Sequence, residues 1–389
     1  MRKIIVGLVG KPSSGKSTFF KAATLIDVKI TGIPFCTIKP NVGIGYVIVD
    51  CVCKEFGVKC NPRTGFCRDG KRFVPVKLID VAGLVPGAHE GRGLGNQFLD
   101  DLRQASALIH VVDFSGLRDE EGRPTSGYDP SRDIEFLEEE IDLWFASVIE
   151  KAVKKFERSL VGKTKADLIE ILTQQLSGLE ILKEHVERAL EKASLTDIKN
   201  FARVLRQISK PILIAANKID LKEARENFEK LKEKYPNVIP TSAEAEVALK
   251  RAAEKGLIDY LPGNGFRIVD ESKLDLSQIK VLELIKKEII EKYGSTGVQE
   301  CLNRTVFELL NYIAVYPVAD SKKLSDKEGR VLPDVFLVPK GIRLKEFAFK
   351  IHTEIGEKFI CGIDARTKRK LSADYELKDK DVIEIAFAK

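Results

Sequence analysis

A glycine-rich phosphate-binding pattern near the N-terminus constrains the fold more than any other feature of the sequence. Residues 4–9 form a continuous apolar run, which is typical of a buried parallel strand. The run leads directly into residues 10–17, Gly-Lys-Pro-Ser-Ser-Gly-Lys-Ser, which match the P-loop pattern G-x-x-x-x-G-K-S. A strand before this pattern and a helix after it predict an α/β P-loop NTPase domain with a mostly parallel sheet.

The residue types in this loop indicate how it would bind a nucleotide. Its glycines let backbone N–H groups surround the β-phosphate, Lys16 adds a positive charge beside the β- and γ-phosphates, and Ser17 offers a hydroxyl to Mg²⁺. The helix expected after the loop directs its positive dipole end at the phosphates. The predicted nucleotide contacts in this loop are Gly10, Pro12, Ser13, Ser14, Gly15, Lys16, Ser17 and Thr18.

Asp80 and Gly83 form a second part of the predicted site, because they follow an apolar run over residues 76–79. A carboxylate at such a strand end can hold Mg²⁺ through water, and the glycine N–H can sense the γ-phosphate. The next residue is Leu84, where hydrolytic GTPases usually carry a glutamine that orients the attacking water. Leucine cannot hydrogen-bond water, so we expect slow intrinsic hydrolysis. His89 is either a residue that positions this water or an ordinary exposed loop histidine.

The pattern that would recognise the base follows another apolar run, over residues 212–216. It reads Asn-Lys-Ile-Asp, and the carboxylate of Asp220 can accept hydrogen bonds from guanine N1 and N2 that adenine cannot donate. A fifth element at 237–240 leads to Thr-Ser-Ala-Glu, whose backbone N–H groups can hold guanine O6. Ligands of open α/β sheets bind at such strand ends. The residues predicted to bind guanine are Asn217, Lys218, Asp220, Ser242, Ala243 and Glu244.

The chain resembles the YchF branch of the Obg-like GTPases in the translation-factor class. The resemblance covers nearly the whole chain and rests on Gly10-Lys11-Pro12, on the run from Pro34 to Asn41 and on the run from Asp80 to Leu99. It implies that Thr37 is a switch I threonine that closes on Mg²⁺, and that residues 84–95 are a glycine-rich switch II. The candidate Mg²⁺ ligands are then Ser17, Thr37 and Asp80, and the candidate catalytic residues are Lys16, Thr37, Gly83, Leu84 and His89.

Two positions depart from the pattern of that family. Many members resemble ATP binders because their guanine motif lacks its last aspartate, whereas Asp220 is present here, so we predict GTP rather than ATP. The asparagine that often follows the P-loop proline and helps to bind a catalytic K⁺ is Ser13 here. This difference leaves stimulation of hydrolysis by K⁺ open.

A helical insertion is predicted between residues 113 and 217, which are about a hundred residues apart, more than one crossover helix needs. Apolar residues recur at spacings of three and four over 134–160 and again over 168–190. This pattern predicts two long amphipathic, coiled-coil-like helices in an antiparallel hairpin, followed by a third helix at 197–208. The arm, about 130–208, either packs only on itself or binds a partner.

The C-terminal segment has a different periodicity. Its pattern of strand, helix, strand and strand resembles the TGS domain, a small β-grasp module, and this resemblance implies contact with RNA or the ribosome. We therefore expect a G domain over 1–310 and a TGS-like domain over 311–389. The predicted elements are a strand and turn at 334–341, a helix at 344–355, a strand at 359–363, and a turn and strand at 378–385.

The charge distribution points weakly to the same contact. The formal net charge is +6, and residues 312–389 carry 16 Lys and Arg against 13 Asp and Glu, which is half of the excess in a fifth of the chain. A basic cluster on a predicted loop is the kind of surface that contacts phosphate, although many such loops are only solvated. The cluster consists of Arg366, Lys368, Arg369 and Lys370.

Four of the seven cysteines, Cys51, Cys53, Cys60 and Cys67, lie in one short segment with the spacing C-x-C-x6-C-x6-C. Four thiolates with tight turns between them could bind a structural Zn²⁺, although the more common C-x2-C pairing is absent. The single Met, the single Trp and the many Lys and Glu residues are typical of a thermophile, whose cytosol tolerates disulfides. Zinc, disulfides and reduced thiols are therefore the three alternatives.

Composition excludes several other classes of protein. With 44% hydrophobic and 31% charged residues the chain can bury a core, which excludes a disordered or fibrous protein. No stretch approaches 18 uncharged apolar residues, so we expect no membrane partner or span. Met-Arg-Lys before the first apolar run imitates a signal peptide, but the run is short and feeds a glycine loop, so we expect a cytoplasmic protein.

The predicted function is that of a GTP-binding switch that hydrolyses GTP slowly, with Mg²⁺, and contacts the ribosome or RNA through the C-terminal module and the helical arm. One alternative is a nucleotide sensor that does not hydrolyse. Others are an NTPase with relaxed preference between GTP and ATP, and a nucleotide-regulated enzyme that acts on another substrate. The last has no support from a Ser/His/Asp set or from paired acids in the sequence.

Overall fold

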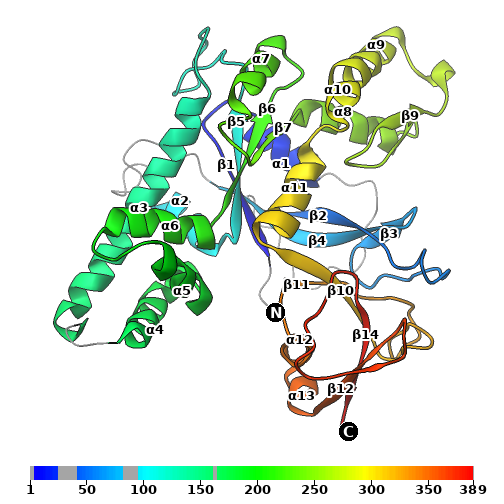
Figure 1. The fold of residues 1–389 in the computed structure, drawn as a ribbon. Helices are drawn as coiled ribbons and strands as arrows, with labels where there is room; N and C mark the ends of the chain where they lie inside the picture. Colours follow the sequence, from blue (N-terminus) through cyan, green and yellow to red (C-terminus); the bar gives the residue numbers. More distant parts are fainter. Residues whose placement is uncertain (1–3, 25–41, 82–94, 161–163, 389) are drawn as a thin grey trace.

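The computed structural model describes residues 4–24, 42–81, 95–160 and 164–388, with backbone only at 95–97, 99–100 and 155–160 (Figure 1). Four of the predicted catalytic residues, Thr37, Gly83, Leu84 and His89, lie outside the described residues. None of the described helices combines the length with the apolar character that a bilayer crossing requires.

A seven-stranded sheet forms the centre of the N-terminal part, in the order β2-β4-β1-β5-β6-β7, with β3 beside β4. Strands β1, β4, β5, β6 and β7 are parallel, and β2 and β3 run antiparallel to β4. The predicted α/β fold with a mostly parallel sheet is therefore confirmed. The strands are β1 (Ile5–Val9), β2 (Val42–Asp50), β3 (Phe66–Arg68), β4 (Lys71–Asp80), β5 (Ala107–Asp113), β6 (Ile212–Asn217) and β7 (Val238–Pro240).

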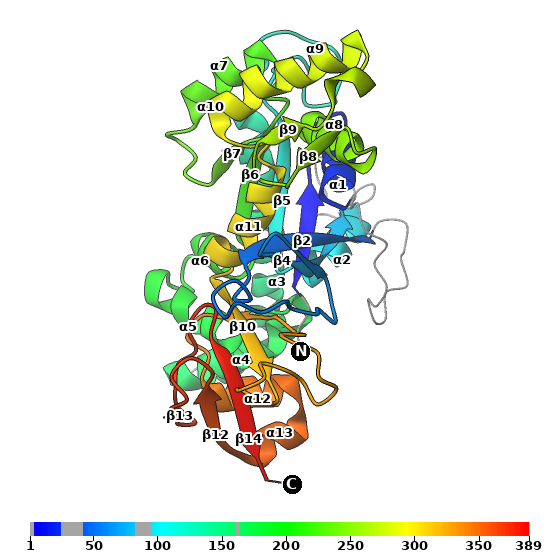
Figure 2. The ribbon, with the colours of Figure 1, turned by 90° about the vertical axis from the view of Figure 1, so that its right-hand side faces the viewer.

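Helices cover both faces of this sheet, as the continuous apolar strands require (Figures 1 and 2). Successive residues of β1 point to opposite faces, so Leu8 enters one core and Val9 the other. The core on the Leu8 side is closed by α1 (Lys16–Thr24), α8 (Ala243–Glu254) and α11 (Val298–Arg304). The core on the Val9 side is closed by α2 (Gly95–Gln104), α3 (Ser131–Leu160) and α6 (Ile198–Ser209). A further helix, α7 (Lys222–Leu231), packs beside β6.

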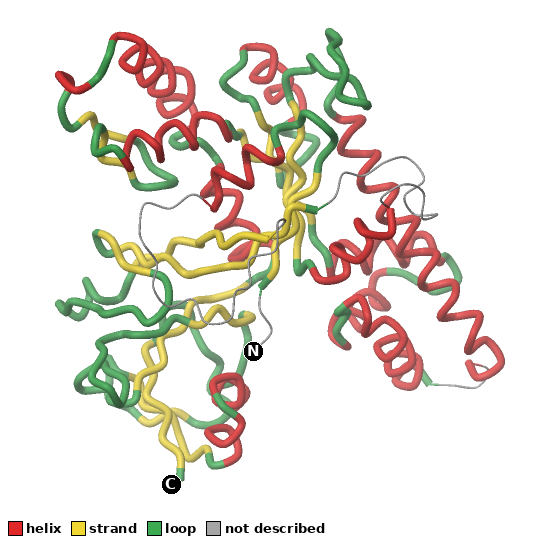
Figure 3. Tube along the Cα trace, turned by 180° about the vertical axis from the view of Figure 1, so that it is seen from behind, coloured by secondary structure: helices red, strands yellow, loops and turns green. Residues whose placement is uncertain are grey.

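The predicted helical insertion lies between β5 and β6, and Figure 3 shows it on one side of the sheet. One expectation about it was wrong, because residues 168–190 do not form a single helix. Helix α4 (Lys165–Leu176) passes into a 3-10 turn, Glu180 takes a left-handed φ of 56°, and α5 (Lys183–Lys192) begins after it. Leu176, Leu179 and Val186 all enter the same core, so the apolar spacing continues through the break.

The segment after β7 is mostly helical, but it also contains a β-hairpin that the sequence did not indicate. Its two strands close a small core with α8 and α9. The elements are β8 (Ile258–Tyr260), β9 (Phe266–Ile268), α9 (Leu276–Ile285), the π-helical turn η4 (Lys286–Ile290), α10 (Glu291–Tyr293), and the π-helical turn η5 (Thr305–Leu309) that follows α11.

The C-terminal part is a five-stranded sheet in the order β11-β10-β14-β12-β13, covered by two short helices. The predicted strands at 334–341, 359–363 and 378–385 are present with shifted bounds. The predicted helix 344–355 is interrupted at His352, which has extended φ and ψ of −162° and 141°. The elements are β10 (Tyr312–Val318), β11 (Phe336–Pro339), α12 (Leu344–Ile351), α13 (Thr353–Glu357), β12 (Phe359–Asp364), β13 (Lys370–Leu371) and β14 (Val382–Phe387).

Strand β10 lies within this sheet, although the sequence did not predict it. It contains Pro317, and proline argues against an interior strand because it cannot donate to the ladder. In the structure β10 pairs with β11 only from Tyr312 to Val315, and it pairs with β14 from Tyr316 onward. Pro317 therefore lies beyond the stretch that β11 pairs with, where β10 has a partner strand on one side.

The two sheets share buried surface and are not separated by a linker. Ala314 of β10 and Leu337 of β11 enter the same core as β1 and α1. Arg72 of β4 is 1% exposed and donates to two backbone oxygens of the C-terminal part, Leu332 O at 3.1 Å and Pro333 O at 2.7 Å. The C-terminal sheet is therefore seated on the β2–β4 end of the first sheet (Figure 1).

Candidate nucleotide-binding site

The P-loop joins β1 to α1, and its backbone takes a conformation that glycine makes possible. Ser13 and Gly15 have positive φ values of 66° and 92°, and Gly15 O accepts from Phe19 N at 2.8 Å to start the helix. A Cβ atom on Gly15 would lie 2.2 Å from Nδ2 of Asn217. Glycine is therefore needed at position 15 both for its dihedral angle and for the approach of the second loop.

Asn217 connects three of the predicted segments. Its Nδ2 donates to Ser14 O of the P-loop at 2.9 Å, and its Oδ1 accepts from Ala243 N at 3.1 Å. The side chain is 3% exposed. The sequence placed Asn217 in the base-binding set, whereas the structure shows it joining the P-loop to the loop before α8.

Lys218 ties the same loop to the P-loop from the other side. It has a positive φ of 67°, and its Nζ donates to Ser13 O at 3.0 Å and to Asp113 Oδ2 at 2.6 Å. Asp113 is 1% exposed, and its second oxygen accepts from Ser115 N and Oγ. The ends of β1, β5 and β6 are thus held together at the carboxyl edge of the sheet.

Asp220 lies half-buried at the outer end of this loop, close to Ser242. Ser242 Oγ donates to Asp220 Oδ1 at 2.7 Å and accepts from Ala245 N at 3.3 Å as the N-cap of α8. Asp220 Oδ2 has no partner among the residues that the structure describes. Ala243 is buried and Glu244 is exposed in the first turn of α8. The carboxylate is therefore oriented by Ser242 and has one oxygen available to a ligand.

Lys16 and Asp80, which the sequence predicted at the phosphate and at the metal, lie in direct contact. Lys16 Nζ pairs with Asp80 Oδ1 and also donates to Val81 O at 2.9 Å. The side chains are 15% and 22% exposed, so a ligand can reach both. Ser17 and Thr18 lie beside them in the first turn of α1, where the helix dipole favours an anion.

The loop fits an anionic ligand in one further respect. Ser14 Oγ is buried within the P-loop and has no hydrogen-bond partner among the described atoms. A buried hydroxyl without a partner costs free energy unless a ligand or water supplies one. Together with the left-handed turn and the paired Lys16 and Asp80, this hydroxyl fits a bound phosphate group with a divalent cation.

Lys11 has a role that the sequence did not indicate. Its side chain is 9% exposed, and Nζ forms an ion pair with Asp133 Oδ2 at 2.7 Å. The same Nζ donates to Arg118 O at 3.1 Å and lies 4.1 Å from the centre of the Tyr128 ring. The P-loop is thereby attached to the segment that leads from β5 into the helical insertion. No motif marks this contact, because it depends on how far the loop at 114–130 folds back.

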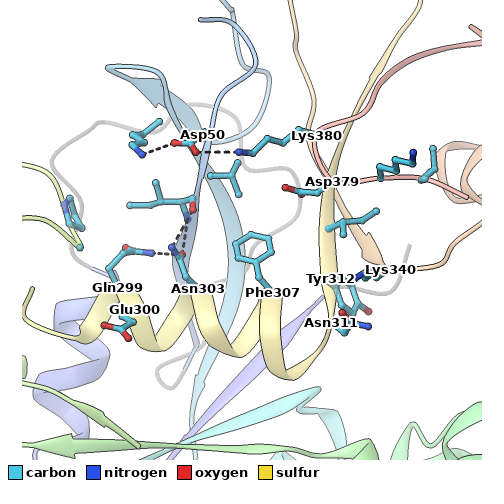
Figure 4. Close-up of a pocket in the computed structure, with 18 of the residues that line it drawn as sticks. Asp50, Gln299, Glu300, Asn303, Phe307, Asn311, Tyr312, Lys340, Asp379 and Lys380 are labelled. Carbon is cyan, nitrogen blue, oxygen red and sulfur yellow. Dashed lines mark hydrogen bonds and ion pairs between the residues drawn. The ribbon is translucent and has the colours of Figure 1, made fainter. Parts of the chain in front are cut away.

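A separate groove of about 750 Å³ lies between β2, α11 and the C-terminal part (Figure 4). Its polar side chains bind one another: Asn303 bonds to the backbone N and O of Ile48 at 2.9 and 3.2 Å, and Gln299 donates to Tyr46 O. Asp50 pairs with Lys71 and Lys380. Asn303 thus occupies the open edge of β2, and the groove walls have a structural role.

The basic cluster of the C-terminal part is divided by its contacts. Arg366 forms a bidentate ion pair with Glu55 at 2.5 and 2.8 Å, and Lys368 Nζ donates to Ser321 O at 2.7 Å. Arg369 and Lys370 are exposed at β13. Arg366 thus joins the two parts of the chain, and contact of the cluster with a phosphate surface stays a prediction.

Three family models match this chain in sequence order. A model described as 50S ribosome-binding GTPase matches residues 5–151, and one described as Obg-like GTPase YGR210-like, G4 motif-containing domain, matches residues 215–320. A model of the TGS domain matches residues 327–386.

Individual relatives cover most of the chain. An uncharacterized GTP-binding protein of Methanocaldococcus jannaschii is 51% identical over 393 residues, which is 99% of each chain. A Bacillus subtilis protein named ribosome-binding ATPase YchF is 33% identical over 289 residues, covering 70% of this chain and 73% of that protein. The crystal structure of a GTP-binding protein from Pyrococcus horikoshii is 41% identical, with a TM-score of 0.78, and covers 99% of this chain and 100% of that one.

Proposed function

This chain belongs to the YchF-like branch of the Obg-family GTPases, and we propose that it is a nucleotide-dependent switch that binds GTP, hydrolyses it slowly and contacts the ribosome. Its C-terminal part is a TGS domain. The main support for the nucleotide site is the pair of contacts by which Asn217 joins Ser14 of the P-loop to Ala243 before α8. They bring the phosphate and base segments to one edge of the sheet.

Different residues of this site would bind the phosphates, hold Mg²⁺ and position the two loops. The P-loop amides and Lys16 would bind the phosphates and stabilise charge that develops on them during hydrolysis. Ser17, Asp80 and Thr37 would hold Mg²⁺, which when bound neutralises phosphate charge. Lys16 and Asp80 are in contact, so the charges that would bind the phosphate and the metal lie side by side. Asn217 and Lys218 would keep the two loops at a fixed separation.

The preference for guanine depends on Asp220. Its carboxylate, oriented by Ser242, would accept from guanine N1 and N2, and adenine offers no matching donors. Isothermal titration with GTP and with ATP tests this directly. We expect Asp220→Asn to lower GTP affinity by about 100-fold or more and to leave ATP affinity unchanged. Glu244→Gln, an exposed neighbour, is the control. Equal affinities of the native chain for GTP and ATP would instead support the relaxed NTPase.

Slow hydrolysis follows from Leu84, which cannot orient water. Single-turnover hydrolysis of GTP, measured with and without ribosomes, distinguishes a slow switch from a nucleotide sensor. A switch hydrolyses measurably in at least one condition, and a sensor in neither. The same assay in KCl and in NaCl tests dependence on K⁺, and His89→Ala tests whether that residue positions the water.

The ribosome contact is proposed from the name of the Bacillus subtilis relative, from the match to the 50S ribosome-binding GTPase model and from the TGS domain. Arg369 and Lys370 are exposed members of the basic cluster in that domain and could contact phosphate. We expect their joint reversal to Glu to reduce co-sedimentation with ribosomes, and Lys222→Glu on α7 to have no effect. Unchanged co-sedimentation would show that Arg369 and Lys370 do not make the contact. Such a role places the protein in the cytoplasm.

A further inference from the structure

The four clustered cysteines lie at the end of β4 that is remote from the nucleotide site. Cys51 follows β2 directly, and Cys67 pairs with Arg72 near the start of β4, whereas Asp80 is the last residue of that ten-residue strand. Cys51 and Cys53 are buried, and Cys60 and Cys67 are half-buried. The cluster is therefore a site of its own.

The sulfur atoms have the separation of a mononuclear thiolate site. All four Sγ atoms lie within 4.8 Å of one another, and the pairs Cys51–Cys60 and Cys53–Cys67 are 3.9 Å apart. Zn–S bonds of about 2.3 Å in a tetrahedron place sulfurs about 3.8 Å apart. A disulfide would require a separation of about 2.05 Å. The geometry thus fits one ion among four sulfurs and not two disulfides.

The chemistry of the donors selects the metal. Four thiolates without a carboxylate or an imidazole favour a soft or borderline ion, and a closed set of four is typical of structural zinc. A cluster of several irons with bridging sulfides needs more room than one ion. A single iron in the same tetrahedron is distinguishable by metal analysis.

The loop that carries these cysteines has few contacts within itself that could fix its shape. Residues 51–65 contain no helix or strand, and Gly65 has a φ of 67° with its Cα so close to β4 that a Cβ would lie 2.0 Å from Phe73 O. Short turns run from Val52 O to Phe56 N at 3.1 Å and from Cys53 O to Val58 N at 3.0 Å. A metal bound by its four thiolates would cross-link this irregular segment and fix its conformation.

The C-terminal domain packs against the same loop. Backbone N–H groups of Asn61 and Arg63 donate to Val331 O at 2.8 Å and Pro333 O at 2.9 Å. Cys51 and Cys53 share a buried core with Tyr316 of β10 and with Leu332 and Val382 of the TGS domain. The shape of the loop therefore determines where the domain rests.

We propose that Cys51, Cys53, Cys60 and Cys67 bind one structural Zn²⁺, and that this ion fixes the loop on which the TGS domain is docked. The site holds the domain at a set position relative to the sheet that carries the nucleotide loops. The ion would fix the position of the TGS domain. This proposal does not depend on whether the chain hydrolyses GTP.

Metal content is the first test. Full-length protein purified without metal-affinity resin or added zinc is expected to contain one Zn²⁺ per chain by mass spectrometry of the elements. Cys60→Ser should lose it, and Cys361→Ser, half-buried in the TGS domain, should retain it. Iron in place of zinc would overturn the choice of metal. Absence of metal, with four thiols that alkylate in the native protein or with an intact mass lowered by disulfides, would overturn the site.

Hydrogen exchange tests the docking without relying on a variant that folds. Zinc is removed from the native chain by a strong chelator under reducing conditions. Exchange at the amides of residues 61 and 63 is then expected to rise markedly, together with that of the 331–333 segment. Exchange in β1, β5 and β6 should stay unchanged. Metal loss without a rise at 61 and 63 would show that the ion does not position the domain.

Discussion

Lys11 of the P-loop and Asp133 in the first turn of α3 form an ion pair at 2.7 Å, with side chains only 9% and 8% exposed. Tyr128 lies against both: its ring faces Lys11 Nζ, and its hydroxyl donates to Asp133 Oδ1 at 2.8 Å. Burial raises the pKa of Asp133, while the bond from Lys11 opposes that rise. The first turn of the helical insertion is thus attached to the P-loop by a buried ion pair.

Removal of one partner should be costly. Asp133→Asn leaves the buried ammonium of Lys11 without its counter-ion, and we expect a loss of about 3–5 kcal/mol in the free energy of unfolding. The double variant Lys11→Met, Asp133→Leu should recover most of this loss. Urea unfolding of the native chain, of Asp133→Asn and of the double variant measures both effects. As a control, Glu135→Gln breaks an exposed pair with Lys234 and should leave the free energy of unfolding almost unchanged. Equal losses of unfolding free energy in Asp133→Asn and Glu135→Gln would contradict this account.

Gly15 offers a sharper test of the contact between the two nucleotide loops. Gly15→Ala adds a methyl group 2.2 Å from Asn217 Nδ2 and a left-handed strain of about 1–2 kcal/mol. We expect nucleotide affinity, measured by titration calorimetry, to fall by at least about 100-fold, since Asn217 must be displaced from Ser14. Gly256→Ala has a similar φ of 68° with nothing within 4 Å, so it carries the strain alone. That variant should bind nucleotide normally.

The residues that the sequence assigned to this site could be found because they lie at the ends of apolar strands. The P-loop, Asp80, Asn217 and Asp220 each follow a continuous apolar run, and parallel strands bring their carboxyl ends to one edge. What a single sequence could not show is which residues contact each other across that edge. Asn217 has a type that suits guanine, yet its amide and carbonyl are occupied by Ser14 and Ala243.

The fold was harder to predict where long-range pairing decides the structure. Pro317 argues locally against an interior strand, and only the ends of β11 and β14 show why it is tolerated in β10. The break between α4 and α5 leaves no trace in the spacing of apolar residues, since both sides of it pack on α3 and α6. Arg366 lies in a basic run that is typical of a phosphate-binding loop. In the structure it forms an ion pair with Glu55, more than 300 residues away in the sequence.

His110 should make stability depend on pH. It lies in β5 at 3% exposure, and burial, with the nearby charge of Lys11, lowers its pKa to about 3. The unfolded chain takes up the proton first, near pH 6.5, so stability is full above that pH and falls as the pH drops toward 3. Between pH 8 and pH 5 we expect His110 to account for a loss of about 2 kcal/mol, at 1.36 kcal/mol per unit.

Unfolding midpoints in urea at several pH values measure that contribution. His110→Leu removes the ionisable group, so this part of the pH dependence should disappear, whatever the variant's stability at pH 8. His352→Asn changes an exposed histidine that caps α13 and keeps a capping side chain there. Its pH profile should match that of the native chain. A native-like slope in His110→Leu would assign the loss to other groups.

Arg72 should be the strongest single contact between the sheet and the TGS domain. Its buried guanidinium donates to the oxygens of Leu332 and Pro333. Arg72→Met would leave Leu332 O without this donor, at about 1–3 kcal/mol, whereas Pro333 O would keep the bond from Arg63 N. We expect faster hydrogen exchange over residues 316–333 and earlier cleavage there in limited proteolysis, with zinc still bound. Arg366→Met removes the half-exposed pair with Glu55 and should change either readout little, by less than about 1 kcal/mol. If the two variants behaved alike, the docking would depend on apolar packing around Tyr316 and not on the buried guanidinium.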